Sequence, residues 1–306
     1  MTTRFKFYLS NPKMILCRLV LLLDKHFVMF PAKFYLSCYY YFHVGEKLNW
    51  DEPKKFNEKL QWLKLYNHDP LYTTLVDKYA VKGYVEKQIG AEYVIPTIAT
   101  YERVEDIDWD SLPNQFVIKC NHDSFSYVIC KDKSQLDRKA AEKRLGHALK
   151  VNYYRIAREW PYKNVKRKII VEKYIEDPSG DLKDYKFFCF NGKVKAMFIA
   201  TDRQKGPAAA RFDFFDENYN HLPMVSEHPN AEVTPVKPEN FELMKSLAEK
   251  MSQGIPFVRV DFYDTQGKVL FGEFTMFHHG GTATFDPEEF EYKFGSWINL
   301  PAKRNS

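Results

Sequence analysis

The sequence predicts an α+β protein with mixed sheets, and three observations lead to this fold class. Helical and strand-like patterns come in runs instead of a strict alternation, which is typical of α+β folds. Asn191-Gly192 separates two strand-like runs, and Asn-Gly is the strongest short-range signal of a β-hairpin. A hydrophobic fraction of 45%, with 13 glycines and 16 prolines in 306 residues, excludes collagen, coiled coils and low-complexity disorder.

The first 33 residues form a basic and apolar segment. They contain six basic residues and one acid, Asp24, whereas the rest of the chain is balanced in charge. Asn11 is placed to cap a helix with Pro12 at its first position, and Phe30, which precedes a proline, marks the expected end. Charges at 18, 24 and 25 interrupt the apolar run, which argues against a membrane span. No small-residue cleavage site follows, which argues against a signal peptide.

Two interpretations of this helical leader (1–50) stay open. The helix can lie on the anionic cytoplasmic face of the inner membrane, giving a peripheral contact through residues 1–45. It can equally dock on the core of its own protein, and the aromatic residues at 34–42 suit either arrangement. We expect no nucleic-acid partner, because the excess charge lies outside the balanced globule. Five cysteines without C-x-x-C spacing argue against disulfides or a zinc module and indicate a cytoplasmic protein.

From residue 50 onward the patterns predict helices followed by strands and hairpins, with no internal repeat. Helices are expected around Trp62 and over 71–89, 134–150 and 239–253, the second stopped by Gly90 and the third opened by the capping-box-like Ser134-Gln135-Leu136-Asp137. Strands are expected at 93–98, 116–120, 127–130 and 168–175, followed by hairpins over 184–201 and around residue 265. The corresponding division is a leader (1–50), an N-terminal subdomain (51–112), a central subdomain (113–180) and a C-terminal subdomain (181–306).

The second hairpin carries the strongest candidate site. A three-residue loop, Thr265-Gln266-Gly267, would pair Asp264 with Lys268, Asp261 with Phe271 and Arg259 with Glu273. One face of the hairpin is then entirely apolar, with Val258, Val260, Phe262, Leu270, Phe274 and Met276. The other face carries Arg259, Asp261, Glu273 and Thr275. Two carboxylates beside an arginine suit a site for Mg²⁺ and phosphate, and the alternative is an exposed, salt-bridged sheet face.

The first hairpin offers a weaker pattern. A two-residue turn would pair Lys186 with Met197 and Asp184 with Ile199, so that all four side chains share a face. An acid and a base beside two apolar chains suit the ribose, phosphate and purine of a nucleotide. The alternative is an ordinary half-exposed sheet.

Several short motifs together resemble a known family. The chain resembles the TupA-like ATP-grasp family, named for a teichuronopeptide biosynthesis protein. The resemblance runs from about Leu48 to the C-terminus and depends on the order and spacing of motifs at 53–59, 77–79, 116–122, 171–175, 184–187, 191–193, 258–261, 272–275 and 280–281.

This resemblance implies two α+β halves that grip ATP between them, together with Mg²⁺. Lys119 would contact the α- and β-phosphates, and the loop 121–126, with Asn121, His122 and Ser124, would cover them. Glu172, Tyr174 and Ile175 would form the adenine hinge, with Asp184 at the ribose. Asp261, Glu273 and Thr275 would hold Mg²⁺, Thr275 standing where many ATP-grasp enzymes have Asn. The catalytic residues would be Arg259, which stabilises the transferring phosphoryl group, and Lys186.

The phosphate loop departs from the family pattern. It is typically glycine-rich, so that backbone N–H groups can wrap phosphate oxygens, whereas this chain reads Asn-His-Asp-Ser-Phe-Ser. Asp123 would put negative charge near the triphosphate, and Phe125 would block close approach of the backbone. Weak nucleotide binding, a loop remodelled for another ligand, and a partly lost function are the three expectations.

The implied reaction is ATP-dependent carboxylate–amine ligation through an acyl phosphate. The expected substrates are an amino acid or amine and a uronic-acid-type carboxylate on a sugar or lipid-linked precursor of a surface polysaccharide. One alternative is a glycosyltransferase with an acidic metal motif at Asp106-Ile107-Asp108 or Asp108-Trp109-Asp110, although these read as loop acids. Another is a nucleotide-binding scaffold subunit without turnover.

Overall fold

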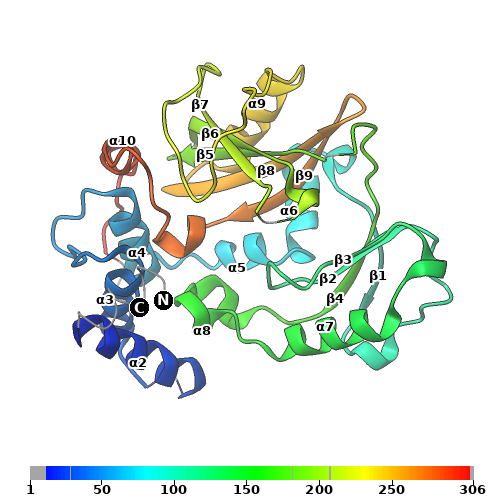
Figure 1. Ribbon diagram of the computed structural model, residues 1–306, viewed down its shortest axis with the longest axis horizontal. Coiled ribbons are helices and arrows are strands. Elements are labelled where there is room, and N and C mark those ends of the chain that lie inside the picture. The colour runs from blue at the N-terminus through cyan, green and yellow to red at the C-terminus, as the bar shows by residue number, and fades with distance from the viewer. Residues whose placement is uncertain (1–11, 28, 181, 207, 304–306) are drawn as a thin grey trace.

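The protein is built on two antiparallel sheets and a group of helices at one end (Figure 1). The computed structural model describes residues 12–303 except 28, 181 and 207. The four-stranded sheet has the order β1-β4-β2-β3 and consists of β1 (Thr97–Tyr101), β2 (Phe116–Cys120), β3 (Val128–Cys130) and β4 (Ile169–Lys173). The five-stranded sheet has the order β7-β6-β5-β8-β9 and consists of β5 (Asp184–Phe190), β6 (Lys193–Thr201), β7 (Arg211–Asp216), β8 (Phe257–Thr265) and β9 (Lys268–Thr275).

The helices cover both sheets and form the end of the molecule near the leader (Figure 1). They are α2 (Pro12–Phe27), α3 (Ala32–Val44), α4 (Phe56–Tyr66), α5 (Leu71–Val76), α6 (Ala80–Ile89), α7 (Arg138–Lys150), α8 (Tyr154–Ala157), α9 (Phe241–Met251) and α10 (Glu289–Trp297). A 3₁₀ turn, η6 (His278–Gly281), follows β9. The predicted α+β class is confirmed. The prediction of mixed sheets is wrong, since each strand pair in the described residues is antiparallel.

One face of the five-stranded sheet is divided into an aromatic half and a polar half. In the aromatic half, Phe188 and Phe257 pack against Phe294 of α10 and Phe56 of α4, with ring centroids 5.6 and 4.9 Å apart. The polar half continues along the same strands with Lys186 and Asp261. The opposite face is apolar and is covered by α9, whose Phe241 packs on Phe187 of β5. The aromatic packing therefore fixes the strands from which the polar side chains project.

The bounds of the first hairpin are as predicted, but its register is wrong by one residue. Asn191 and Gly192 both have positive φ, as a two-residue hairpin turn requires. A bulge beyond Phe188 places an extra residue in β6, so Lys186 lies opposite Phe198, and Asp184 lies opposite Ala200. Met197 and Ile199 consequently point to the other face of the sheet.

The register of the second hairpin also differs from the prediction. The turn has two residues, Gln266 and Gly267, both with positive φ, so Thr265 pairs with Lys268. A bulge at Gly272 then shifts the pairing, and Asp261 lies opposite Glu273 while Arg259 lies opposite Thr275. Leu270, predicted on the apolar face, is paired with Tyr263 and lies on the other one. The predicted polar set keeps its common face, because the bulge compensates for the shorter turn.

Several predicted elements have different bounds, and three of these differences have a local physical reason. The helix expected over 71–89 is broken, because the Asp77 carboxylate accepts hydrogen bonds from the N–H groups of Tyr79 and Ala80 and caps a new helix. The strand expected at 93–98 begins only after Pro96, which cannot donate to a ladder. The third helix is capped by Asp137, whose side chain accepts from the N–H of Ala140, and not by Ser134.

The leader forms two packed helices, α2 and α3. The Asn11 cap lies outside the described residues. In the described part of the chain, no helix is both long and apolar enough to cross a membrane. β1, from the predicted N-terminal subdomain, pairs with β4 of the central one, and the subdomain bounds stay a prediction.

Candidate active site

The polar half of the five-stranded sheet brings together the residues predicted to hold metal and phosphate. Both carboxylate oxygens of Asp261 accept hydrogen bonds at 2.7 Å from Arg259, one from Nε and one from Nη2. Lys186 Nζ lies 2.5 Å from Asp261 Oδ2, and Arg259 Nη2 lies 3.3 Å from Glu273 Oε1. Strands β5, β8 and β9 thus contribute to one cluster.

The acids of this cluster are ionised at neutral pH. Burial alone would raise the pKa of Asp261, but the charges of Arg259 and Lys186 bring it below its ordinary value. Burial acts in the same way on Glu273, and Lys78 leads the groups that lower the pKa of that carboxyl. Burial lowers the pKa of Lys186, and Asp261 opposes this. The cluster therefore holds two charged carboxylates, and both oxygens of Asp261 are bonded to its cationic neighbours.

His278, in η6, holds the guanidinium of Arg259. The imidazole is buried, and Arg259 Nη1 donates to its Nδ1 over 3.0 Å. Burial, together with the charges of His279 and Arg259, brings the pKa of His278 well below its usual value, so its ring is neutral and can accept. Arg259 is consequently fixed by Asp261, Glu273 and His278 at once.

Lys78 is a site residue that sequence reasoning missed. It lies in the break between α5 and α6, and its Nζ donates to the backbone oxygen of Asp123 over 2.6 Å and lies 3.7 Å from Glu273 Oε2. Its backbone N–H donates to the Asn121 oxygen. Lys78 thus links the loop after β2 to β9. The motif Asp77-Lys78-Tyr79 could have indicated that this lysine belongs to the site. The prediction of one continuous helix over 71–89 gave it no such role.

The four-stranded sheet carries a second charged cluster around Glu172. Lys119 Nζ lies 2.5 Å from one oxygen of Glu172, and Lys82 Nζ lies 2.6 Å from the other. Burial would raise the pKa of Glu172, but the two lysines bring it below its ordinary value. Lys119 and Glu172, predicted separately at the phosphates and at the adenine hinge, therefore form an ion pair, and Lys82, from α6, joins them without a sequence signal.

The glycine-free loop 121–126 is held by its own side chains. Asn121 is buried, donates to the Asp77 carboxylate and accepts from the N–H of Lys168. Asp123 Oδ1 accepts from the Ser126 hydroxyl, which in turn accepts from the N–H of Cys120. The carboxylate of Asp123 is thus bonded inside the loop.

The other loop residues differ in exposure. His122 is buried, with Nε2 3.3 Å from the Val151 oxygen, and burial lowers its pKa. Ser124 is exposed, and its hydroxyl lies 3.3 Å from that of Tyr153. Phe125 has 79% of its surface exposed. Asn121 and His122 therefore contact protein, and of the three loop residues predicted to bind nucleotide, only Ser124 is exposed; direct nucleotide contacts by the three stay a prediction.

The hinge segment after β4 is tied to the second hairpin. The backbone oxygen of Glu176 accepts from the Thr265 hydroxyl over 3.2 Å. Tyr174 and Ile175, the predicted hinge residues, are half-buried. Asp184, the predicted ribose contact, is buried, forms an ion pair with Arg203 and lies 3.7 Å from Lys186 Nζ. The contact of Thr265 with Glu176 thereby joins the segment after β4 to β8 of the five-stranded sheet.

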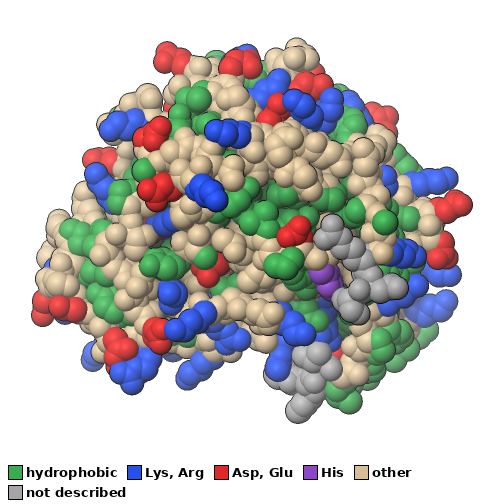
Figure 2. Space-filling model, turned by 180° about the vertical axis from the view of Figure 1, so that it is seen from behind, with side chains coloured by type: hydrophobic (Ala, Val, Ile, Leu, Met, Phe, Trp, Pro, Cys, Tyr) green, Lys and Arg blue, Asp and Glu red, His purple; other side chains and the backbone are tan. Residues whose placement is uncertain are grey.

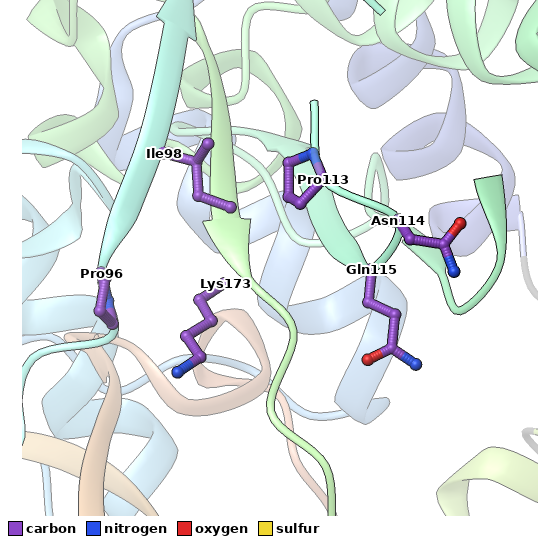
Figure 3. A pocket seen from close by; sticks show the side chains of 6 residues that line it. All are labelled: Pro96, Ile98, Pro113, Asn114, Gln115 and Lys173. Atoms are coloured by element: carbon purple, nitrogen blue, oxygen red, sulfur yellow. The ribbon is translucent and has the colours of Figure 1, made fainter. Parts of the chain in front are cut away.

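A pocket of about 560 Å³ lies beside the four-stranded sheet, but it belongs to neither cluster. Figure 3 shows its lining, which consists of Pro96, Ile98, Pro113, Asn114, Gln115 and Lys173. Lys173 follows Glu172 on β4, so the two side chains point to opposite faces of the sheet. The predicted site residues do not line this pocket.

The residues of the first cluster fit Mg²⁺ together with a nucleotide. Mg²⁺ is usually bound by one or two carboxylates plus substrate phosphates, and Asp261 and Glu273 supply this donor set from opposed positions on β8 and β9. Within the described residues, no group of three or more His, Cys, Asp or Glu side chains could hold a metal ion. Lys78, Lys186 and Arg259 add the positive charge that a triphosphate requires.

Comparison with known proteins identifies the class to which this fold and site belong. The model of the TupA-like ATP-grasp family matches residues 58–299, so the chain belongs to this family and has the ATP-grasp fold. No curated protein matches.

Solved structures with ATP-grasp folds are similar at low identity. D-alanine–D-alanine ligase from Bacillus anthracis, solved with ATP, is 17% identical over 66% of this chain and 54% of that chain, with a TM-score of 0.38. The same enzyme from Helicobacter pylori is 12% identical over 80% and 70%, with a TM-score of 0.46. The biotin carboxylase domain from Hydrogenobacter thermophilus, solved with MgADP, is 14% identical over 76% and 47%, with a TM-score of 0.42. This chain spans about half the length of the Bacillus anthracis ligase.

Proposed function

We propose that this protein is an ATP-dependent carboxylate–amine ligase that works through an acyl phosphate. The observation that carries the proposal is the cluster of Arg259, Lys186, Asp261 and Glu273 on one sheet face, with both acids ionised. Membership of the ATP-grasp family supports the same assignment.

In this proposal the cluster performs phosphoryl transfer. Asp261, Glu273 and Thr275 would hold Mg²⁺, which supplies charge neutralisation to the phosphates when bound. Arg259, fixed on three sides, would direct its guanidinium at the transferring group, where charge develops. Lys186 and Lys78 would contact the phosphates on either side. A substrate carboxylate oxygen attacks the γ-phosphorus and ADP leaves; an amine then attacks the acyl carbon, and phosphate leaves as the amide forms.

The second cluster would bind the rest of the nucleotide. Lys119 would reach the α- and β-phosphates, while Glu172 and the backbone through Ile175 would receive the adenine. Asp184 would face the ribose. Glu172 offsets one of the two positive charges of Lys119 and Lys82, so one positive charge remains for the phosphates.

The proposed substrates are an amino acid or amine and a uronic-acid-type carboxylate on a sugar or lipid-linked precursor of a surface polysaccharide. The support is the family resemblance to a teichuronopeptide biosynthesis protein. The geometry of the site does not distinguish between carboxylates.

The glycosyltransferase alternative has no supporting observation. Asp106 forms an ion pair with Arg103, Asp110 forms one with Arg138, and Asp108 accepts from the N–H of Ser111. These acids are thus engaged in local contacts on a loop. The scaffold alternative differs from the ligase only in turnover and is decided by the same experiment.

The test is phosphate release from Mg-ATP with pairs of candidate carboxylates and amines. The ligase releases ADP and phosphate only when both substrates are present. Glu273→Gln should abolish release, while Glu239→Gln, an exposed acid before α9, should not. ADP formation that is independent of any carboxylate contradicts the proposal, and nucleotide binding without turnover for every pair supports the scaffold instead.

A further inference from the structure

In the described part of the chain, helix α2 presents an exposed apolar face. Its exposed residues recur at the spacing of one helical face and have 42–59% of their surface exposed: Ile15, Leu16, Leu19, Leu22 and Leu23. Met29 and Phe34, just beyond the helix, are exposed at 62% and 46% and extend the same apolar surface along the chain. Exposed leucines concentrated in this way are uncommon on a protein surface without a partner.

The opposite face of α2 is docked on the protein, which fixes the direction of the apolar face. Met14, Val20 and Asp24 are buried. The Asp24 carboxylate forms an ion pair with the buried Arg158 and accepts from the N–H of Phe30. The guanidinium of Arg158 lies over the Tyr35 ring at 4.8 Å. The interpretation that the helix docks on its own protein therefore applies to this face. The membrane interpretation concerns the exposed apolar face.

The charge of the leader indicates what covers the apolar face. Asp24 is the single acid among residues 1–33, and its pairing with Arg158 removes its charge from the surface. The other charged residues of this segment are basic, and Lys13, Arg18 and Lys33 are exposed. The half turn between the figures brings α2 from the lower left of Figure 1 to the lower right of Figure 2. Hydrophobic, Lys and Arg side chains lie together at that corner of Figure 2.

A groove beside α2 repeats this combination of charge and apolar surface. It has a volume of about 580 Å³ and is lined by apolar and aromatic side chains together with Arg18, Arg155 and His43. Leu21 and Leu22 of α2 are among the lining residues. Burial lowers the pKa of His43, so the positive charge of the groove comes from its two arginines. Apolar side chains beside arginines match the acyl chains and anionic headgroups of a lipid leaflet.

We propose that α2 binds the surface of an anionic lipid bilayer, with its leucine face inserted at the boundary of headgroups and acyl chains. A helix of 16 residues with this distribution lies in the plane of the interface. Arg18 and the neighbouring basic residues contact the anionic headgroups. This inference does not depend on the proposed ligase activity.

The leader is joined by packed contacts to the edge of the candidate active site. Arg158 follows Ala157 at the end of α8, and Lys64 Nζ donates both to the Ala157 oxygen and to the Gly280 oxygen. Gly280 lies in η6, two residues after His278, the partner of Arg259. A bilayer-bound α2 therefore keeps η6 at a fixed position relative to the lipid surface.

The test is flotation of the full-length protein with vesicles, without nucleotide. The wild type should bind vesicles of phosphatidylcholine with 30% phosphatidylglycerol at least about tenfold more tightly than vesicles of phosphatidylcholine alone. The double substitution L19E/L22E should reduce this binding by at least about tenfold, because both leucines insert. The matched control V233E/V236E changes two valines that are 81% and 84% exposed elsewhere and should bind as the wild type does.

A charge variant separates the two parts of the proposal. R18Q should weaken binding to the anionic vesicles about fivefold and leave the thermal unfolding midpoint unchanged, since the side chain is exposed. Absence of wild-type flotation with anionic vesicles would overturn the proposal. Flotation of L19E/L22E at the wild-type level would also overturn the proposal. A leucine-dependent dimer in gel filtration, without vesicle binding, would overturn it as well and would assign the face to a second copy of the chain.

Discussion

Each sheet buries a carboxylate between two cations, but only one of these clusters has the composition of a reaction centre. Glu172 lies between Lys82 and Lys119, and both of its oxygens are taken by lysines. Asp261 lies between Arg259 and Lys186, with Glu273 opposite it across the hairpin. The additional carboxylate gives this cluster the two acids that the proposed Mg²⁺ site requires. A buried carboxylate between two cations is therefore not enough by itself to identify a reaction centre.

The largest difference between the clusters should appear when one charge is removed from each. Glu273→Gln should lower kcat at least about a hundredfold, because it removes a metal ligand that acts in the transition state. Glu172→Gln should mainly raise the KM for ATP. Steady-state kinetics with the substrate pair that supports phosphate release measures both, and a Glu273→Gln enzyme within threefold of the wild type would refute the metal assignment.

Removing a cation should also affect stability more in the first cluster than in the second. Arg259→Met leaves Asp261 with one cationic partner and removes the donor to His278, and should cost about 3 kcal/mol of unfolding free energy. Lys119→Met leaves Glu172 bonded to Lys82 and should cost about 1–2 kcal/mol. Urea unfolding at pH 7 compares them, and equal costs would mean that the two ion pairs are equivalent.

Glu291 is a buried acid outside both clusters, and the effect of burial on its pKa exceeds the opposing effects of Asn57 and Lys55. Burial raises the pKa of Glu291 to about 8, well above its value in an unfolded chain, so the folded state holds a proton that the unfolded state has lost. Stability should therefore fall by about 2 kcal/mol from pH 6 to pH 8 relative to a Glu291→Gln variant. Urea unfolding at both pH values tests this against the exposed control Glu289→Gln, and a pH-independent difference would disprove it.

The smallest effect is expected in the phosphate loop. Asp123→Ala removes the hydrogen bond to Ser126 and should cost about 1 kcal/mol of stability. Because the carboxylate is bonded within the loop, affinity for an ATP analogue should change less than threefold. Calorimetric titration measures the affinity, and a large gain would show that Asp123 repels the triphosphate.

The sequence predicts the polar face of the last hairpin well and its pairing poorly. Side chains alternate with a period of two, so Arg259 shares a face with Asp261, and Glu273 shares one with Thr275. The two pairs meet on one face because the bulge at Gly272 offsets the shorter turn. The turn type and the bulge at Gly272 depend on packing against neighbouring strands, so the opposite partners were assigned wrongly. Asn191-Gly192 fixed the bounds of the other hairpin for a local reason, since only such residues accept positive φ in both turn positions.

Contacts between distant elements could not be predicted. Lys82 reaches Glu172 from a helix, and His278 reaches Arg259 from a 3₁₀ turn; neither contact has a local pattern. Lys78 was hidden because apolar periodicity over 71–89 suggested one helix, whereas the Asp77 cap starts a new one. The leader was ambiguous for a physical reason: its helix is apolar on two faces, and the structure uses one for docking and leaves the other exposed.

The most direct test of the central claim is calorimetric binding of a non-hydrolysable ATP analogue with and without Mg²⁺. The wild type and Lys119→Ala should both bind more tightly when Mg²⁺ is present, with Lys119→Ala weaker in both conditions. Glu273→Gln should bind equally with and without Mg²⁺, because the cation loses one of its two carboxylates. A Glu273→Gln protein that keeps the full Mg²⁺ enhancement would contradict the assignment of the cluster on β8 and β9 as the site of metal and phosphate.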